Sequence, residues 1–322
     1  MSLIKQWLSG ELQRLRHIAP IRVIATVEAK CNLACHHCYW SHDIHEPHTS
    51  NWEAQATRIA SMKAPVFYAG RILTPRGMNL LNACHSAGVK HFGIVDNGYT
   101  IFCAPTEWLH RFESINISID GWREAHEKQR NKEGSFNVAW SAIRKLKGEG
   151  LDPIVSSAFS HMSFDGWDRF EGLLAENDVP MSSTLIYVTS PVQIRGTALY
   201  KDEDMVRKAF SVLRNGMPKL INIYALEHVR TLTPLFREMA WQPDAVDGDS
   251  LIARLENGVQ VIYRPISIQW AAEVTLRWDG RFYPPTADGE SSPVTIDHIS
   301  DDYFKRIAEL SKQELEVWSE IL

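Results

Sequence analysis

Cysteine is scarce in this chain. The sequence has only five cysteines in 322 residues, and none of them follows Cys103. An odd number of cysteines in a chain of this size does not indicate a disulfide framework. The whole region after Cys103 therefore supplies no thiolate for a metal ion or a cluster.

A long apolar run is also missing. No stretch of about 18 apolar residues occurs, which excludes a membrane span on sequence grounds. Residues 1–20 are charged and lack the apolar segment of a signal peptide. The formal net charge of −5 disfavours a long nucleic-acid footprint. We expect a cytoplasmic protein whose partners include neither a membrane nor a nucleic acid.

Strand-like and helix-like patterns alternate through the first part of the chain. This order predicts parallel strands joined by crossover helices, in an α/β fold. Six such units are too few for a complete eight-fold barrel, so we expect a partial (β/α)6 TIM-like barrel. The expected strands are 21–28, 65–70, 89–98, 114–121, 151–160 and 181–190, and the expected helices are 51–62, 78–87, 136–147 and 164–176.

Three regions are expected along the chain. Residues 1–20 form an N-terminal helix, residues 21–200 the barrel core, and residues 201–322 a small α+β C-terminal cap. Within the cap, residues 257–270 and 273–285 have the pattern of antiparallel strands.

Special residues follow several of the expected strands. The cysteine-rich segment, Gly70, Asn97 and Asp120 each come directly after a strand. Because functional residues of such folds gather at the carboxyl ends of parallel strands, we expect these residues to share one rim.

Three cysteines fall within eight residues, as Cys31-X3-Cys35-X2-Cys38. Thiolates are the usual ligands of iron–sulfur clusters, and a complete set is four. Three thiolates can hold three irons of a [4Fe–4S] cluster and leave the fourth iron open. A structural zinc site is the alternative, with His36, His37 or His42 as the fourth ligand.

This spacing after a first strand resembles the signature of the radical S-adenosylmethionine superfamily. The resemblance implies two cofactors, a [4Fe–4S] cluster and S-adenosyl-L-methionine. It also implies reductive cleavage of the latter to a 5′-deoxyadenosyl radical, which abstracts hydrogen from a small-molecule or peptide substrate. An external one-electron donor of the flavodoxin or ferredoxin type is implied as a partner.

A second segment strengthens the resemblance. Residues 117–146 are similar to the S-[IL]-D-G…H…R…G-S-F segment of the family. The resemblance implies that Ser118 contacts the ribose of the cofactor and that Arg130 approaches its carboxylate. Without the family context, Ser118 is a satisfied hydroxyl at a strand end and Arg130 a solvated helix charge.

Other cofactor contacts are implied with weaker matches. Ala69, Gly70 and Arg71 stand where the family has G-G-E, so the acidic side chain is lost and only backbone contacts remain. The implied cofactor-binding residues are His37, Ala69, Gly70, Asn97, Ser118, Arg130 and Arg195.

The C-terminal region resembles the SPASM-type branch of the superfamily but lacks its cysteines. Pro285 stands where that branch usually has a cysteine, so we expect a single cluster. Without a second cluster to accept an electron, redox-neutral reactions such as epimerisation or rearrangement are favoured, and oxidation stays an alternative. The candidate catalytic residues are Cys103, Tyr99 and Asp120.

Two other functions stay open at this point. One is a zinc-stabilised, non-catalytic binding module on a barrel scaffold. The other is a degenerate family member that binds S-adenosylmethionine without turnover, an idea supported by Arg71 in place of the acidic residue.

Overall fold

The computed structural model describes part of the chain. The described residues are 22–28, 30–38, 51–70, 73–185, 211–223, 238, 242–247, 250–263, 273–283 and 316. The N-terminal helix expected over residues 1–20, the boundary expected at residue 200, and the site residues Arg71 and Arg195 lie outside these ranges.

Strands and helices alternate along the described chain, as the sequence predicted. The strands are β1 (Arg22–Ala25), β2 (Val66–Ala69), β3 (Phe92–Asp96), β4 (Ser114–Ser118), β5 (Pro153–Phe159), β6 (Met181–Leu185), β7 (Leu220–Ile223), β8 (Gln242–Asp247), β9 (Ser250–Arg254), β10 (Gln260–Tyr263), β11 (Glu273–Leu276) and β12 (Phe282–Tyr283). The helices are α2 (Glu53–Met62), α3 (Pro75–Ser86), α4 (Tyr99–Cys103), α5 (Thr106–Leu109), α6 (Arg123–Arg130), α7 (Ser135–Gly148) and α8 (Trp167–Glu176).

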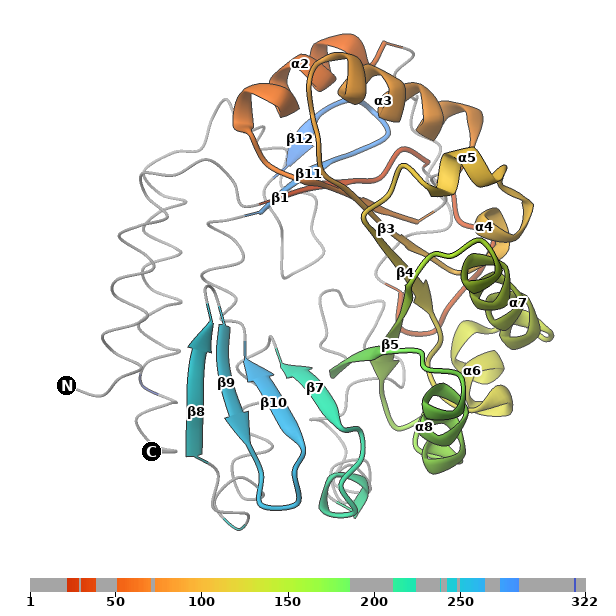
Figure 1. The fold of residues 1–322 in the computed structure, drawn as a ribbon, viewed down its shortest axis with the longest axis vertical. Helices are drawn as coiled ribbons and strands as arrows, with labels where there is room; N and C mark the ends of the chain where they lie inside the picture. The colour runs from red at the N-terminus through yellow and green to blue at the C-terminus, as the bar shows by residue number, and fades with distance from the viewer. Residues whose placement is uncertain are drawn as a thin grey trace.

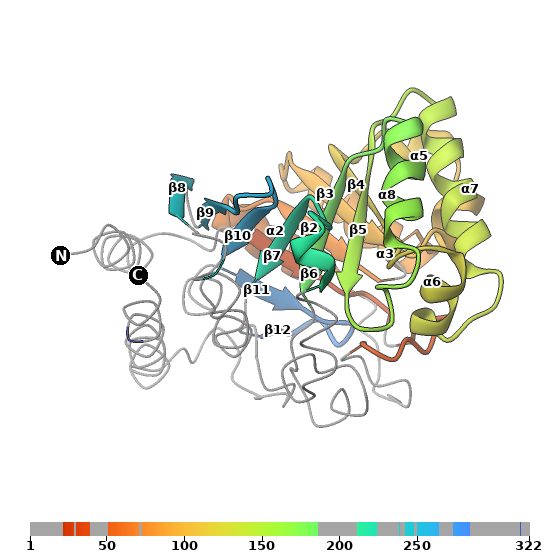
Figure 2. The ribbon, with the colours of Figure 1, turned by 90° about the horizontal axis from the view of Figure 1, so that it is seen from below.

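The described strands form one sheet, in the order β12-β11-β1-β2-β3-β4-β5-β6-β7-β10-β9-β8. Each pairing from β11 through β1 and β7 to β10 is parallel, and only the outermost strands β12, β9 and β8 join antiparallel. The sheet is strongly curved, and α2 to α8 cover its outer face (Figures 1 and 2). This arrangement confirms the partial barrel.

Residues of the expected C-terminal cap contribute strands to this sheet. The hairpin β9–β10 pairs with β7, and the hairpin β11–β12 pairs with β1 at the other end of the strand order. The turn of the second hairpin lies at Asp279–Gly280, where Gly280 N–H donates to the Arg277 carbonyl at 2.9 Å. Each hairpin is antiparallel, as expected, but its inner strand runs parallel to the barrel strands.

The core lies between the sheet and the helices. Along β5 buried and half-buried residues alternate, which is the pattern of a strand with one face packed. At the end of β5 the ring of Phe159 lies 4.9 Å from that of Trp167, centroid to centroid, in an edge-to-face contact. Trp167 in turn contacts Phe170 at 5.5 Å. Aromatic pairs of this kind anchor α8 on β5.

Several boundaries differ from the sequence prediction; helix α8, for example, begins at Trp167 and not at Phe164. Helix α3 begins at Pro75 and not at Met78, because Thr74 caps it by accepting the Gly77 N–H at 3.2 Å and proline suits the first helical position. Helices α4, α5 and α6 were not predicted. The first two are too short for a periodic pattern, and the buried face of α6 includes His126, Gln129 and Arg130, which are polar.

Gly98 provides a test of the packing between α4 and α7. Its φ is +93°, and a Cβ there would lie 2.7 Å from the Cα of Ala139 in α7. Gly98→Ala should therefore lower the free energy of unfolding by about 2–4 kcal/mol, from backbone strain and a clash that only backbone movement relieves.

Gly134→Ala is the matched control. Gly134 also has a positive φ, +76°, but a Cβ there meets no atom within 4 Å. Gly134→Ala should lower the free energy of unfolding by only about 1 kcal/mol, because the left-handed conformation is its only source of strain. Urea unfolding measures both variants, and equal losses would contradict the proposed contact with Ala139.

Candidate functional site

The carboxyl ends of β1 to β4 lie side by side. Their last residues pair with the neighbouring strands in register: Ala25 with Tyr68, Ala69 with Val95, and Asp96 with Ile117. The cysteine segment, Gly70, Asn97 and Asp120 therefore leave the sheet at one rim. This confirms the arrangement expected from their positions after predicted strands.

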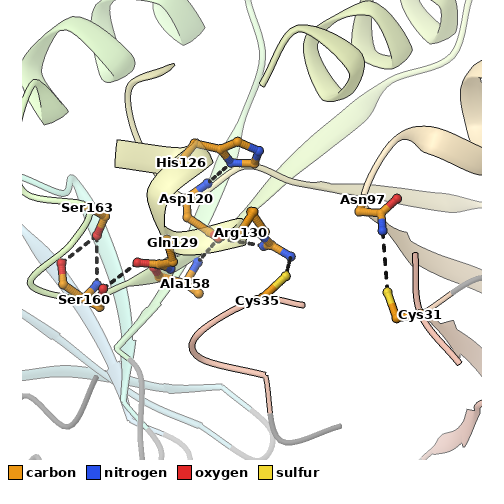
Figure 3. A network of polar contacts seen from close by, with 10 residues as sticks. All are labelled: Cys31, Cys35, Asn97, Asp120, His126, Gln129, Arg130, Ala158, Ser160 and Ser163. Atoms are coloured by element: carbon orange, nitrogen blue, oxygen red, sulfur yellow. Dashed lines mark hydrogen bonds and ion pairs between the residues drawn. The ribbon is translucent and has the colours of Figure 1, made fainter. Parts of the chain in front are cut away.

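The cysteine loop follows β1 and is joined to the end of β3. Cys31, Cys35 and Cys38 are half-buried, and none of the three is in a disulfide. The side-chain amide of Asn97 donates to Asn32 Oδ1 at 2.9 Å and lies 3.9 Å from Cys31 Sγ (Figure 3). Asn97 is thus more than a turn residue, because it connects the loop to β3.

Asp120 and Arg130 form a buried ion pair next to the loop. Arg130 Nε donates to Asp120 Oδ2 at 2.5 Å, and Arg130 Nη2 donates to Oδ1 at 2.7 Å. Asp120 is fully buried, and its Oδ1 also accepts the Ala158 N–H at 2.9 Å. The third guanidinium nitrogen, Nη1, lies 3.9 Å from Cys35 Sγ (Figure 3). The pair places a positive charge against one of the three thiols.

The ion pair sets the protonation state of Asp120. Burial raises its pKa, but the charge and hydrogen bonds of Arg130, together with the nearby His37 and His126, outweigh burial and hold the pKa at about 2. A carboxylate that is buried, doubly paired and ionised at neutral pH cannot donate a proton to a substrate. This geometry is that of a residue that positions Arg130, and the assignment of Asp120 as a catalytic residue stays a prediction.

Burial also controls the other titratable groups of the site. It raises the pKa of the Cys35 thiol to about 12, against the opposing effect of Arg130. It lowers the pKa of His37 to about 4 and that of His126 to about 3. His126 is neutral accordingly, and its Nδ1 accepts the Asp120 N–H at 3.1 Å.

Helix α6 contacts the loop through its last turn. The carbonyl of Gln129 accepts the His36 N–H at 2.9 Å. The side chain of Gln129 is bound at both ends, since Nε2 donates to the Ala158 carbonyl at 2.7 Å and Oε1 accepts from Ser160 Oγ at 2.5 Å. Sequence reasoning gave no role to Gln129, Ser160 or His126, because buried polar residues leave no periodic signal.

The remaining expected residues lie at the rim in different settings. Ser118 ends β4 and is buried beside Ser156 of β5. Ala69 ends β2, and Gly70 follows it with a φ of +85°. Their cofactor contacts stay predictions.

Tyr99 and Cys103 lie together on the short helix α4, which follows β3. Both line a hollow of about 500 Å³ that also includes Asn32 of the cysteine loop. Cys103 is exposed, and it ends the short helix α4. The structure thus brings these two candidates near the loop, although no described contact joins either of them to a thiol of the loop.

The described residues contain no group of three His, Cys, Asp or Glu side chains arranged to hold a single metal ion. In an iron–sulfur cluster each thiolate binds a different iron, so the sulfurs need not converge on one ion.

The chain was compared with known proteins. No family model matches it. It is 23% identical over 173 residues to the sporulation killing factor maturation protein SkfB of Bacillus subtilis, a match that covers 49% of this chain and 42% of SkfB. The chain thus spans less than half the length of this curated relative.

Solved structures match over most of the chain. SuiB of Streptococcus suis, bound to precursor peptide SuiA, matches with a TM-score of 0.60 at 12% identity, covering 93% of this chain and 67% of SuiB. Native anSMEcpe with bound AdoMet and Cp18Cys peptide matches with a TM-score of 0.53 at 14% identity, covering 92% of this chain and 83% of anSMEcpe. At these identities the likeness shows the fold.

The chain has the radical S-adenosylmethionine fold. This finding confirms the resemblance that the cysteine loop and residues 117–146 indicated. Among the helices that the structure describes, none is long and apolar enough to cross a membrane.

The Asp120–Arg130 pair gives a prediction about stability. Asp120→Asn should lower the free energy of unfolding at pH 7 by about 3–5 kcal/mol, because it leaves the Arg130 charge buried without its partner. Urea unfolding of the metal-free protein measures the loss. Asp152→Asn is the control, since Asp152 is exposed and its replacement should change stability by less than about 0.5 kcal/mol.

The pH dependence follows from the lowered pKa. Because the pKa of Asp120 falls from 3.8 to about 2 on folding, its contribution is complete above pH 3.8 and is lost as the pH falls toward 2. The stability difference between the wild type and Asp120→Asn should therefore shrink over this interval. A difference that stays constant down to pH 2 would contradict the ion pair.

Proposed function

We propose that this chain is a radical S-adenosylmethionine enzyme that holds one [4Fe–4S] cluster through Cys31, Cys35 and Cys38. The observation that carries the proposal is the guanidinium of Arg130, fixed by Asp120 with one nitrogen 3.9 Å from Cys35 Sγ. A bare thiolate is costly there, because burial raises the pKa of Cys35. A bound cluster and the neighbouring cation together offset that cost.

The donor set fits the cluster. Thiolates are its usual ligands, and three of them leave one iron open for S-adenosyl-L-methionine. When bound, these two groups supply the reductive cleavage that starts hydrogen abstraction from a substrate. The three cysteines lie at the rim where parallel β/α barrels hold their ligands, which supports this proposal.

The protein's own residues bind and orient the cofactor. We assign Ser118 to a ribose hydroxyl, because a buried hydroxyl can both donate and accept there. Arg130 still has N–H groups not used by Asp120, and we assign these to Cys35 and to the cofactor carboxylate. Ala69, Gly70, Asn97 and His37 complete the proposed pocket, together with Arg195 outside the described residues.

The proposed substrate is a peptide. SuiB was solved with a precursor peptide and anSMEcpe with the Cp18Cys peptide, and SkfB is named for the maturation of a sporulation killing factor. These relatives favour a peptide over a free small metabolite. No cysteine follows Cys103, so these 322 residues provide no thiolates for a second cluster in the C-terminal region. We expect an external one-electron donor to reduce the single cluster.

Anaerobic reconstitution with iron and sulfide tests the proposal. The wild-type protein should bind about four irons per chain and release 5′-deoxyadenosine when it is reduced with S-adenosylmethionine. Cys35→Ala should lose both properties, because one of the three ligands is gone. Iron analysis and chromatography of the nucleoside products measure them.

Cys84→Ala is the matched control. Cys84 is buried in the core on α3, away from the loop, so its removal changes the thiol count but not the ligand set. It should keep the iron and the cleavage activity. A colourless wild-type protein with about one zinc per chain would support the zinc-stabilised module and contradict the proposal. Iron binding without cleavage would support the degenerate member.

A further inference from the structure

Gln129 has an unusual environment for a helix residue. It lies in the last turn of α6 and is fully buried, next to Arg130 in the sequence. Burying an amide without partners is costly, but here both ends of the side chain are bound. Nε2 donates to the Ala158 carbonyl and Oε1 accepts from Ser160 Oγ (Figure 3).

Ala158 is the point at which α6 is fixed on β5. Its N–H donates to Asp120 Oδ1 at 2.9 Å, and its carbonyl accepts from Gln129 Nε2 at 2.7 Å. The backbone of Ala158 therefore binds both Asp120, which is the ion-pair partner of Arg130, and Gln129, which precedes Arg130 in the sequence. The position of the last turn of α6 is set by these two bonds together.

Ser160 is itself held in a tight turn. Its N–H donates to Ser163 Oγ at 2.8 Å, and Ser163 Oγ donates to the Ser160 carbonyl at 2.8 Å. A Cβ at Gly121 would lie 3.1 Å from the Ser163 carbonyl oxygen, so this turn also packs closely against the loop after β4. Ser160 thus offers Gln129 a fixed donor.

The other end of this network is the cysteine loop. The Gln129 carbonyl is among the last carbonyls of α6, which have no partner inside the helix, and it accepts the His36 N–H at 2.9 Å. His36 lies directly after Cys35 in the sequence.

We propose that Gln129 is a positioning residue of the cluster site, which fixes where α6 meets the cysteine loop and where the Arg130 guanidinium meets Cys35. It acts through Arg130 and through its own carbonyl, and it contacts neither the cluster nor the substrate. This inference rests on the proposed function for the cluster, but the geometry it describes belongs to the metal-free chain as well.

Gln129→Met tests the proposal, because methionine keeps the volume and removes both side-chain bonds. In the metal-free protein, hydrogen exchange at the His36 amide should become about tenfold faster, since the last turn of α6 is no longer fixed. In the reconstituted protein, the midpoint potential of the cluster should shift to more negative values, because the guanidinium near Cys35 stabilises the added electron less well.

Asn222→Leu is the matched control. Asn222 is a buried amide in β7 whose Nδ2 donates to Ser182 Oγ and to the Ser183 carbonyl, each at 2.9 Å. Its replacement removes a similar pair of bonds in another part of the sheet. It should lower the stability of the protein without changing the His36 amide or the potential. Equal exchange at His36 in both variants would show that Gln129 is a general core residue and would overturn the proposal.

Ser160→Ala provides a second variant if Gln129→Met does not fold. It removes the donor to Gln129 Oε1 and the acceptor of the Met162 N–H, but it keeps the bond from Gln129 Nε2 to the Ala158 carbonyl, so it should speed exchange at His36 less than Gln129→Met does. The double variant should exchange no faster than Gln129→Met alone, because their shared bond is already lost. Fully additive effects would contradict a common route through Gln129.

Iron reconstitution and hydrogen exchange in the metal-free protein test the two proposals separately. A wild-type protein that takes up no iron refutes the proposed function. The His36 amide in the metal-free protein still decides whether Gln129 positions the loop.

Discussion

The ion pair between Asp120 and Arg130 is the interaction on which the site depends. A guanidinium is too costly to bury alone, and a carboxylate in the same place would take up a proton. Together they remain charged inside the protein, and the fork of the arginine fixes the direction of its third nitrogen toward Cys35. The Ala158 N–H completes the coordination of the carboxylate. Strand β4, strand β5 and helix α6 are thereby held in one arrangement around a single charge.

The sheet supports this arrangement because its register brings the carboxyl ends of neighbouring strands to the same edge. Parallel pairing places the ends of β1 to β4 at one rim, so that loops distant in the sequence meet there. Asn97, directly after β3, and Gln129 of α6 contact the cysteine loop from separate parts of the fold. The loop is thus held by side chains and carbonyls of its neighbours before any cofactor is considered.

Much of this could be predicted from the sequence. The three cysteines and the strand ends were found from spacing and from alternation, which are local properties of the chain, and Ser118 was implied by the resemblance of residues 117–146 to the family segment. Helix α6 was missed because most of its buried positions are polar, which is the opposite of the pattern used to recognise a helix. The partnership of Asp120 with Arg130 was missed for a related reason, since the sequence shows two charged residues but not that burial forces them to pair. The place of β11 beside β1 could not be predicted either, because no local pattern specifies which distant strand completes a sheet.

The position of β11 has a consequence for how the protein is made. Strand β1 lies between β2 and β11, and Thr26 just after it binds the Leu276 carbonyl through both its N–H and its hydroxyl. One side of the strand that leads into the cysteine loop is therefore completed only after residue 276 has left the ribosome. Contacts of such long sequence separation form late and slowly during folding. The loop that carries the three thiols starts near the beginning of the chain, yet its support is among the last parts of the structure to be assembled.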